Sequence, residues 1–265
     1  MGGYLENKII PATPSSPSLS DWHHRYLQQA RWTGEIRKHL FNRTDLHTSD
    51  KILEVGSGTG AVLESLLEEG DFFLSGIDID RSSLHFAQNL QKSFRLVQAN
   101  GYELPFPEDS FTISYCHYLL LWVKHPDRIL AEMRRVTKKG GCVITLAEPD
   151  YQSRIDFPPP LDQLGEQQTQ SLQAQGADIS IGRKLGMLFN NVGFIEVEIG
   201  ILGAQWTAIR KHHLNKTEWM TIQSDLADQL SNQILLAYQE LDQTARANGE
   251  RVLFIPTFYA SGVVP

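Results

Sequence analysis

The chain of 265 residues is poor in two features that would each define a class of protein. It has 2 cysteines, Cys116 and Cys142, which exclude a disulfide framework and a four-cysteine zinc site. Its longest apolar run is Tyr118–Val123, which is too short to span a bilayer. We therefore expect two buried free thiols and no membrane span.

Positive charge is also scarce. The sequence has 24 Lys and Arg against 31 Asp and Glu, which gives a formal net charge of −7 and a pI near 5.7. An acidic surface repels DNA, RNA and anionic lipid, so we expect no nucleic-acid partner. The first residues lack the basic start and apolar core of a secretory signal, and the cytoplasm is the expected location.

The most informative stretch is Lys51–Gly60. An apolar run, Ile52–Val55, leads directly into glycines at positions 56, 58 and 60, and an apolar helical pattern follows. Glycine has no Cβ, so it allows φ > 0 in a turn and lets a ligand lie directly on the backbone. A strand, a glycine-rich turn and a helix open a doubly wound α/β fold, whose ligand sits beyond the carboxyl ends of the strands.

The residues of this turn indicate a kind of ligand. The spacing is G-x-G-x-G rather than the G-x-G-x-x-G of pyrophosphate binders, and Glu54 precedes it. A carboxylate repels a phosphate but attracts an ammonium or a hydroxyl, whereas free backbone N–H groups can hold a carboxylate. A ligand with an amino-acid head and a nucleoside tail meets both requirements. The alternative is a glycine-rich turn without a ligand.

Two further residues extend the predicted site. Asp78 ends the next expected strand, Phe72–Asp78, at the place where an acid accepts hydrogen bonds from ribose hydroxyls. A helical pattern over Asp21–Phe41 is expected to cover the ligand end of the sheet. Arg31 would then pair with a ligand carboxylate. The alternatives are a loop carboxylate for Asp78 and a solvated helix face for Arg31.

The remaining patterns predict one domain with a tail and a cap. Residues 1–20 are rich in Pro and Ser and indicate an irregular tail, and residues 21–265 form the domain. Strands and helices alternate as far as Glu148, which predicts a parallel sheet. Helices at about 159–192 and 212–248 are the expected cap over a substrate. The last expected strands are Ile195–Leu202 and Val252–Phe258, the second interrupted by Pro256.

The order of these motifs resembles that of class I S-adenosylmethionine-dependent methyltransferases, most closely the branch of small-molecule and quinone methyltransferases. The resemblance is carried by four segments, Ile52–Gly60, Gly76–Asp80, Asn100–Phe106 and Arg135–Gly141. It implies an α/β fold with a mostly parallel seven-stranded sheet and a reversed last strand. It also implies transfer of a methyl group from S-adenosyl-L-methionine to a small-molecule acceptor, which leaves S-adenosyl-L-homocysteine.

The resemblance also implies roles for individual residues. The glycine loop would lie against the methionine part of the cofactor, Asp78 would bind the ribose, and Ile79 would pack on the adenine. The family commonly has Asp where this chain has Asn100, which keeps an acceptor oxygen but loses the charge. The expected cofactor contacts are Arg31, Glu54, Gly56, Ser57, Gly58, Gly60, Asp78, Ile79, Asn100, Gly101, Tyr102 and His117.

The expected chemistry needs few catalytic groups. The methyl group of a sulfonium is already activated, so the enzyme mainly aligns it, excludes water and removes a proton from the nucleophile. No metal is required. His117 is the expected base because a histidine pKa lies near neutrality, and the alternative is a residue that positions the cofactor or packs. Trp122, Tyr151 and Arg154 are expected to line the acceptor pocket.

Two other functions fit parts of the sequence. A non-catalytic protein that keeps the cofactor site is one, because Asn100 replaces the usual Asp. A nicotinamide-dependent oxidoreductase on a similar sheet is the other, although Glu54 and the glycine spacing argue against it.

Overall fold

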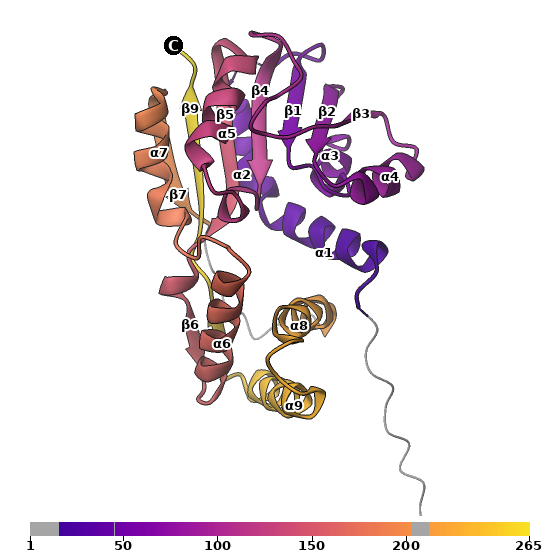
Figure 1. The fold of residues 1–265 in the computed structure, drawn as a ribbon, viewed down its shortest axis with the longest axis vertical. Helices are drawn as coiled ribbons and strands as arrows, with labels where there is room; N and C mark the ends of the chain where they lie inside the picture. The colour runs from indigo at the N-terminus through magenta and orange to yellow at the C-terminus, as the bar shows by residue number, and fades with distance from the viewer. Residues whose placement is uncertain (1–15, 45, 203–211) are drawn as a thin grey trace, which may run out of the picture.

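The computed structural model describes residues 16–44, 46–202 and 212–265, so the expected tail over residues 1–20 lies mainly outside the described residues. Its largest sheet consists of β1 (Lys51–Val55), β2 (Phe73–Asp78), β3 (Phe94–Gln98), β4 (Phe111–His117), β5 (Thr137–Pro149), β7 (Ile195–Ile201) and β9 (Thr257–Val263). The strand order is β3-β2-β1-β4-β5-β9-β7 (Figure 1). β9 runs antiparallel to both of its neighbours, and the other pairs are parallel. The predicted seven-stranded sheet with a reversed last strand is confirmed.

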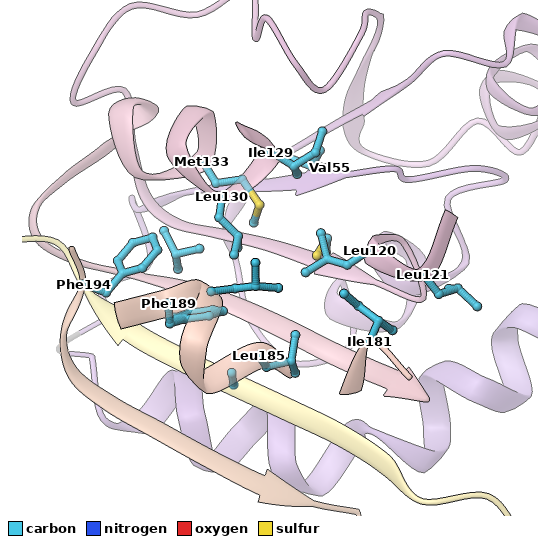
Figure 2. Close-up of a cluster of buried hydrophobic side chains, with 14 of the residues drawn as sticks. Val55, Leu120, Leu121, Ile129, Leu130, Met133, Ile181, Leu185, Phe189 and Phe194 are labelled. Atoms are coloured by element: carbon cyan, nitrogen blue, oxygen red, sulfur yellow. The ribbon is translucent and has the colours of Figure 1, made fainter. Parts of the chain in front are cut away.

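Helices cover both faces of this sheet. On one face, α5 (Pro126–Val136) and α7 (Leu185–Val192) pack with Leu53 and Val55 of β1, in the cluster drawn in Figure 2. On the other face, α1 (Leu19–Trp32), α2 (Gly34–Asn42) and α3 (Ala61–Leu66) pack with Ile52. α4 (Arg81–Asn89) packs beside β2 and β3. Because side chains alternate along a strand, Glu54 points to the same face as Ile52.

A smaller helical cap lies beyond the carboxyl ends of the parallel strands (Figure 1). α6 (Leu161–Ala174), α8 (His212–Leu226) and α9 (Asn232–Asn248) share an apolar cluster that includes the fully buried Trp219. Next to α6, β6 (Ile155–Phe157) pairs with β8 (Val252–Phe254) in a second, antiparallel sheet. Among the described residues, no helix combines the length and apolar character that crossing a bilayer requires.

The helices differ from the expected ones in two places. The expected helix over Asp21–Phe41 is broken at Thr33, whose Oγ1 donates to the Ala30 carbonyl at 3.1 Å, so two helices replace one. Within the expected cap segment 159–192, α6 packs with α8 and α9, whereas α7 packs with α5, β7 and β9. The α7 helix therefore belongs to the layer that covers the sheet.

The last expected strand, Val252–Phe258, is divided in the structure. β8 ends at Phe254 and β9 begins at Thr257, so the interruption falls at Pro256, as expected from its missing N–H. β9 continues to Val263, beyond the expected end. β6 was not expected, because its three residues follow no strand pattern long enough to be recognised.

Candidate functional site

The loop between β1 and α3 exposes backbone at the carboxyl end of the sheet. Gly56, Gly58 and Gly60 have φ of 77°, 49° and 77°, in the left-handed region that favours glycine. The N–H groups of Gly56 and the next residue both donate to the Ile77 carbonyl at 2.8 Å, which ties the start of the loop to β2. A Cβ on Gly58 would have one neighbour within 4 Å, a carboxylate oxygen of Asp78 at 4.0 Å. The loop surface at Gly58 is therefore open backbone.

Asp78 ends β2 and faces this loop. Its Oδ2 accepts a hydrogen bond from the Gly58 N–H at 2.7 Å, and its Oδ1 accepts one from the Asp80 N–H at 2.8 Å. Each carboxylate oxygen has a second lone pair, so Asp78 can still accept hydrogen bonds from ribose hydroxyls. The next residue, Ile79, is 68% exposed and offers an apolar surface of the kind that packs on a flat ring.

Helix α1 lies against the same loop. His23 places Nδ1 3.0 Å from Thr59 Oγ1 and Nε2 3.3 Å from Glu64 Oε2. Burial lowers the pKa of His23, and the Glu64 charge opposes this shift. On the same helix, burial and the negative charge of Asp78 raise the pKa of Tyr26. The N-terminal helix therefore flanks both the glycine loop and the acid of β2, where we expected it.

Arg31 lies on the exposed side of α1, so the structure favours the solvated-face alternative for it. Arg25, earlier on the same helix, is 8% exposed. Its guanidinium carbon lies 4.8 Å from the centroid of the Trp32 ring, and Nη1 donates to Thr217 Oγ1 of α8 at 3.5 Å. Sequence reasoning missed Arg25 because its neighbour in α8 is 192 residues away along the chain.

Glu54 lies beneath the loop and is 2% exposed. It pairs in register with Tyr115 of β4. Burial raises the pKa of Glu54 to about 8, and nearby Tyr115 and Arg37 only partly offset this effect. Its Oε2 has no hydrogen-bond partner among the described residues. An ammonium group at this position would supply the missing donor, so the site fits the amino end of the predicted ligand.

His117 ends β4 on the same face of the sheet as Tyr115. Its Nε2 is 3.3 Å from Thr33 Oγ1, at the break between α1 and α2. Burial and the nearby Arg37 charge lower the pKa of His117 to about 3. A group with so low a pKa is a weak proton acceptor at neutral pH. The structure therefore disfavours His117 as the base and leaves it a hydrogen-bonding role.

The loop after β3 approaches the end of β1. A Cβ on Gly101 would lie 2.9 Å from Ile129 and 3.3 Å from Val55, so a glycine is needed for this close approach. Asn100 is exposed, and its Oδ1 accepts a hydrogen bond from the Tyr102 N–H at 3.1 Å. This loop supplies the third segment of the edge that begins with the glycine loop and Asp78.

Of the three residues expected to line the acceptor pocket, Arg154 lies close to Tyr151, because its backbone N–H donates to the Tyr151 carbonyl at 3.4 Å and its charge acts on the Tyr151 pKa. Trp122, in the short 3₁₀ helix η1 (Leu120–Trp122), is 47% exposed. Arg154 is held by other groups, because Nε donates to Asp156 at 2.6 Å and Nη1 donates to Gln168 Oε1 at 2.9 Å. Tyr151, in η2 (Tyr151–Ser153), has a pKa raised by burial and by the neighbouring Tyr118 hydroxyl. Tyr151 and Arg154 therefore both lie next to the cap, Arg154 through its bonds to α6.

Polar side chains gather around Tyr151 where α1, the end of β4 and the cap meet. Asp225 of α8 accepts a hydrogen bond from Gln168 Nε2 at 2.8 Å, and burial raises its pKa to about 6. The charges of Arg25 and Asp225 both act on the pKa of Tyr151, and that of Arg25 also acts on Tyr118. We call these five residues the cap-facing cluster: Arg25, Tyr118, Tyr151, Gln168 and Asp225.

Glu148 connects this region to the glycine loop. It is fully buried at the end of β5, where its carboxylate accepts hydrogen bonds from the N–H groups of Leu119 and Leu120 at 3.0 and 2.9 Å and of the next residue at 3.2 Å. The turn that it holds sets the Leu119 side chain against Gly56, where an added Cβ would lie 2.8 Å from Leu119 Cδ1. Glu148 therefore positions the apolar wall of the loop.

Comparisons with known proteins agree with this geometry. A family model described as "Methyltransferase domain" matches residues 53–145, which include the glycine loop, Asp78 and the loop after β3. Phosphatidylethanolamine N-methyltransferase of Cereibacter sphaeroides is 32% identical over 120 residues, covering 42% of this chain and 58% of the relative. Demethylmenaquinone methyltransferase of Tropheryma whipplei is 32% identical over 122 residues, covering 45% of this chain and 48% of the relative. The chain thus spans about half the length of these curated relatives.

A solved structure shows the same fold. Phosphoethanolamine N-methyltransferase 2 of Haemonchus contortus, in complex with S-adenosyl-L-methionine, has a TM-score of 0.57 and 14% identity, over 87% of this chain and 52% of that chain. At this identity the likeness concerns the fold alone. Residues 53–145, which hold the glycine loop, Asp78 and the loop after β3, are thus similar to a methyltransferase domain, on a fold shared with this S-adenosyl-L-methionine-binding enzyme.

Proposed function

We propose that this chain transfers a methyl group from S-adenosyl-L-methionine, the cofactor bound by the methyltransferase whose fold it shares, to a small-molecule acceptor. The observation that carries the proposal is the continuous edge formed by three left-handed glycines and Asp78. Bare backbone lets the methionine part of the cofactor lie on the loop. Asp78, whose Oδ2 already fixes Gly58, accepts the ribose hydroxyls.

The other site residues fit the same ligand. The unpartnered oxygen of Glu54 accepts the ammonium group, Ile79 covers the adenine, and Asn100 offers an acceptor for the adenine amino group. When bound, the cofactor supplies a methyl group that its positively charged sulfur has already activated. The chain then has to orient the acceptor and exclude water. Both raise the rate of methyl transfer, the first by holding the reacting atoms close together and the second by keeping the site dry.

The acceptor binds between the carboxyl end of the sheet and the cap. The cap-facing cluster lies in this region, and Tyr118 directly precedes the turn that holds Leu119 against the glycine loop. The names of the relatives include a phospholipid amine and a quinone precursor, which we take as the first acceptors to test. Asp225, with a pKa of about 6, is a better proton acceptor at neutral pH than His117.

Labelled methyl turnover tests the proposal. The purified chain and donor labelled in the methyl group are incubated with amines, quinols, phenols and carboxylic acids. We expect label to enter one of these classes, and Asp78→Ala to raise the donor KM about 10- to 100-fold, the loss expected for hydrogen bonds to a charged group. Asp71→Ala is the control, because Asp71 is exposed before β2 and should leave the KM unchanged.

A non-catalytic cofactor-binding protein is the second candidate, favoured by Asn100 in place of the usual Asp and by the low pKa of His117. It predicts that S-adenosyl-L-homocysteine binds while no acceptor class gains label. Turnover with any acceptor eliminates it.

Glu54 makes cofactor affinity depend on pH. Its pKa of about 8 means that it is protonated below pH 8 in the unliganded protein. An adjacent ammonium group lowers this pKa, so binding of the ligand releases a proton from Glu54. The affinity that the ionised carboxylate contributes is therefore fully present above pH 8 and is lost as the pH falls. We expect the affinity for S-adenosyl-L-homocysteine to rise by up to roughly tenfold per pH unit between pH 6.5 and 8. Calorimetric titrations across this range measure it.

Glu54→Gln is the matched variant for this prediction, because the amide keeps the shape but cannot titrate. Its affinity should be weaker and nearly independent of pH. A wild-type affinity that stays flat, or an equal slope in Glu54→Gln, would show that the ammonium group does not bind there.

A further inference from the structure

Arg25 of the cap-facing cluster is a buried cation that has no ion pair with any residue that the structure describes. It is 8% exposed, and within residues 16–44, 46–202 and 212–265 no carboxylate lies within ion-pair distance of its guanidinium. Its Nε has no hydrogen-bond partner in the same ranges. Its direct contacts in these ranges are a long hydrogen bond to Thr217 Oγ1 at 3.5 Å and the face of the Trp32 ring. Burying a charge is costly unless an opposite charge pairs with it, so this site lacks an anion.

Nearby acidic side chains are already engaged elsewhere. Asp225 receives its hydrogen bond from Gln168, and Asp156 pairs with Arg154 and Arg251. Burial raises the pKa of Asp225 to about 6 against the opposing charge of Arg25, so Asp225 is near Arg25 but forms no close ion pair with it. No described carboxylate closes an ion pair with Arg25, so its guanidinium donors remain available to a bound anion.

The position of Arg25 connects it with the acceptor rather than the cofactor. Its charge acts on Tyr118 and Tyr151, which lie at the end of β4 and after β5, and its hydrogen bond reaches α8 of the cap. The cofactor edge is contacted by other residues of the same helix, because His23 contacts Thr59 and Tyr26 lies near Asp78. Arg25 thus faces the cap while its neighbours on α1 face the glycine loop.

We propose that Arg25 binds a carboxylate or phosphate group of the methyl acceptor, so that this protein methylates acidic small molecules. A guanidinium offers a planar pair of donors that matches either oxyanion. The Trp32 ring faces the guanidinium, and the Arg25 charge reaches the hydroxyls of Tyr118 and Tyr151, so aromatic side chains near Arg25 suit the hydrophobic body of such an acid. This inference rests on the proposed function, because it names the acceptor class of the same site.

The test measures anion binding without turnover. Protein saturated with S-adenosyl-L-homocysteine, and protein without it, are titrated with sodium benzoate, phenyl phosphate and neutral benzamide. We expect benzoate or phenyl phosphate to bind at least tenfold more tightly than benzamide. Which of the two anions binds shows whether the site takes a carboxylate or a phosphate. Arg25→Met should abolish the preference, and Arg25→Lys should keep part of it. Arg31→Met, on the exposed side of the same helix, should change nothing.

Three results would overturn the inference. Equal binding of the anions and benzamide to the wild-type protein is the first, and a preference that survives Arg25→Met is the second. The third is loss of S-adenosyl-L-homocysteine binding in Arg25→Met, which would assign the guanidinium to the cofactor carboxylate. If Arg25→Met fails to fold, the inference is still tested by the preference of the wild-type protein for anions over benzamide and by the reduction of that preference in Arg25→Lys. Failure of the proposed function looks different, because the wild-type protein would then bind no S-adenosyl-L-homocysteine at all.

Discussion

We expect Gly58→Val to weaken the binding of S-adenosyl-L-homocysteine at least 100-fold and to leave the fold intact. Gly58 has φ of 49°, where a residue with a side chain costs roughly 1–2 kcal/mol. The unliganded protein has room for the new atoms, because a Cβ there would meet only Asp78 Oδ2 at 4.0 Å. The valine methyl groups instead fill the space in which the ligand lies on the backbone. Calorimetric titration gives the affinity, and a thermal melt verifies the fold.

Gly140→Val is the matched control. Gly140 has φ of 73°, and a Cβ there would meet nothing within 4 Å. The variant therefore carries a similar backbone strain, near the start of β5 and away from the glycine loop. Its affinity should equal that of the wild type. If the two variants lost affinity equally, or if Gly58→Val bound the ligand like the wild type, the glycine loop would not be the surface that binds the cofactor.

We expect Asp242→Ala to lower the free energy of unfolding of the cap by about 3–5 kcal/mol, the usual cost of removing one partner of a buried ion pair. Asp242 is 2% exposed and accepts hydrogen bonds from Trp219 Nε1 at 2.9 Å, Arg246 Nε at 2.8 Å and Arg251 Nε at 2.7 Å. Alanine removes the acceptor of the Trp219 indole N–H. It also leaves the buried Arg251 paired with Asp156 alone among the described carboxylates. Urea unfolding, monitored by tryptophan fluorescence, measures the change.

The pH dependence of this cluster has a definite sign. Burial alone would raise the pKa of Asp242, but the hydrogen bonds from Arg246 and Trp219 outweigh it and the pKa is lowered. The stabilisation is therefore present above the ordinary pKa of 3.8 and is lost as the pH falls through the lower folded value. Asp228→Ala, at an exposed position of the cap, should change stability by less than about 0.5 kcal/mol. A loss below about 1 kcal/mol for Asp242→Ala contradicts the role of this cluster.

The parts of the fold that local chemistry determines were predictable from the sequence. In α5, Pro126 stands at the first turn, and Ile129, Leu130 and Met133 are all buried, as their helical spacing indicates. The glycine loop and Asp78 were predictable for the same reason, since both follow directly from strands that the apolar pattern marks. Asp78 then reaches Gly58, twenty residues earlier, because the parallel strands end at the same edge.

The remaining features depend on contacts between distant segments. Arg25 and Arg31 occupy the same helix and differ only in what the fold places beside them, so their sequence contexts do not distinguish them. His117 has an ordinary histidine context, yet burial near Arg37 lowers its pKa to about 3. β6 forms a sheet with β8, which lies almost one hundred residues later, and the three residues of β6 are too few to show a pattern alone.

The most direct measurement is a calorimetric titration of the wild-type chain with S-adenosyl-L-homocysteine at pH 8. Our account predicts binding with one ligand per chain, a dissociation constant on the order of micromolar, and a higher melting temperature in the presence of the ligand. A well-folded chain that releases no heat and shows no shift in melting temperature would contradict it, and quenching of NADH fluorescence by the same sample would point to a nicotinamide nucleotide instead.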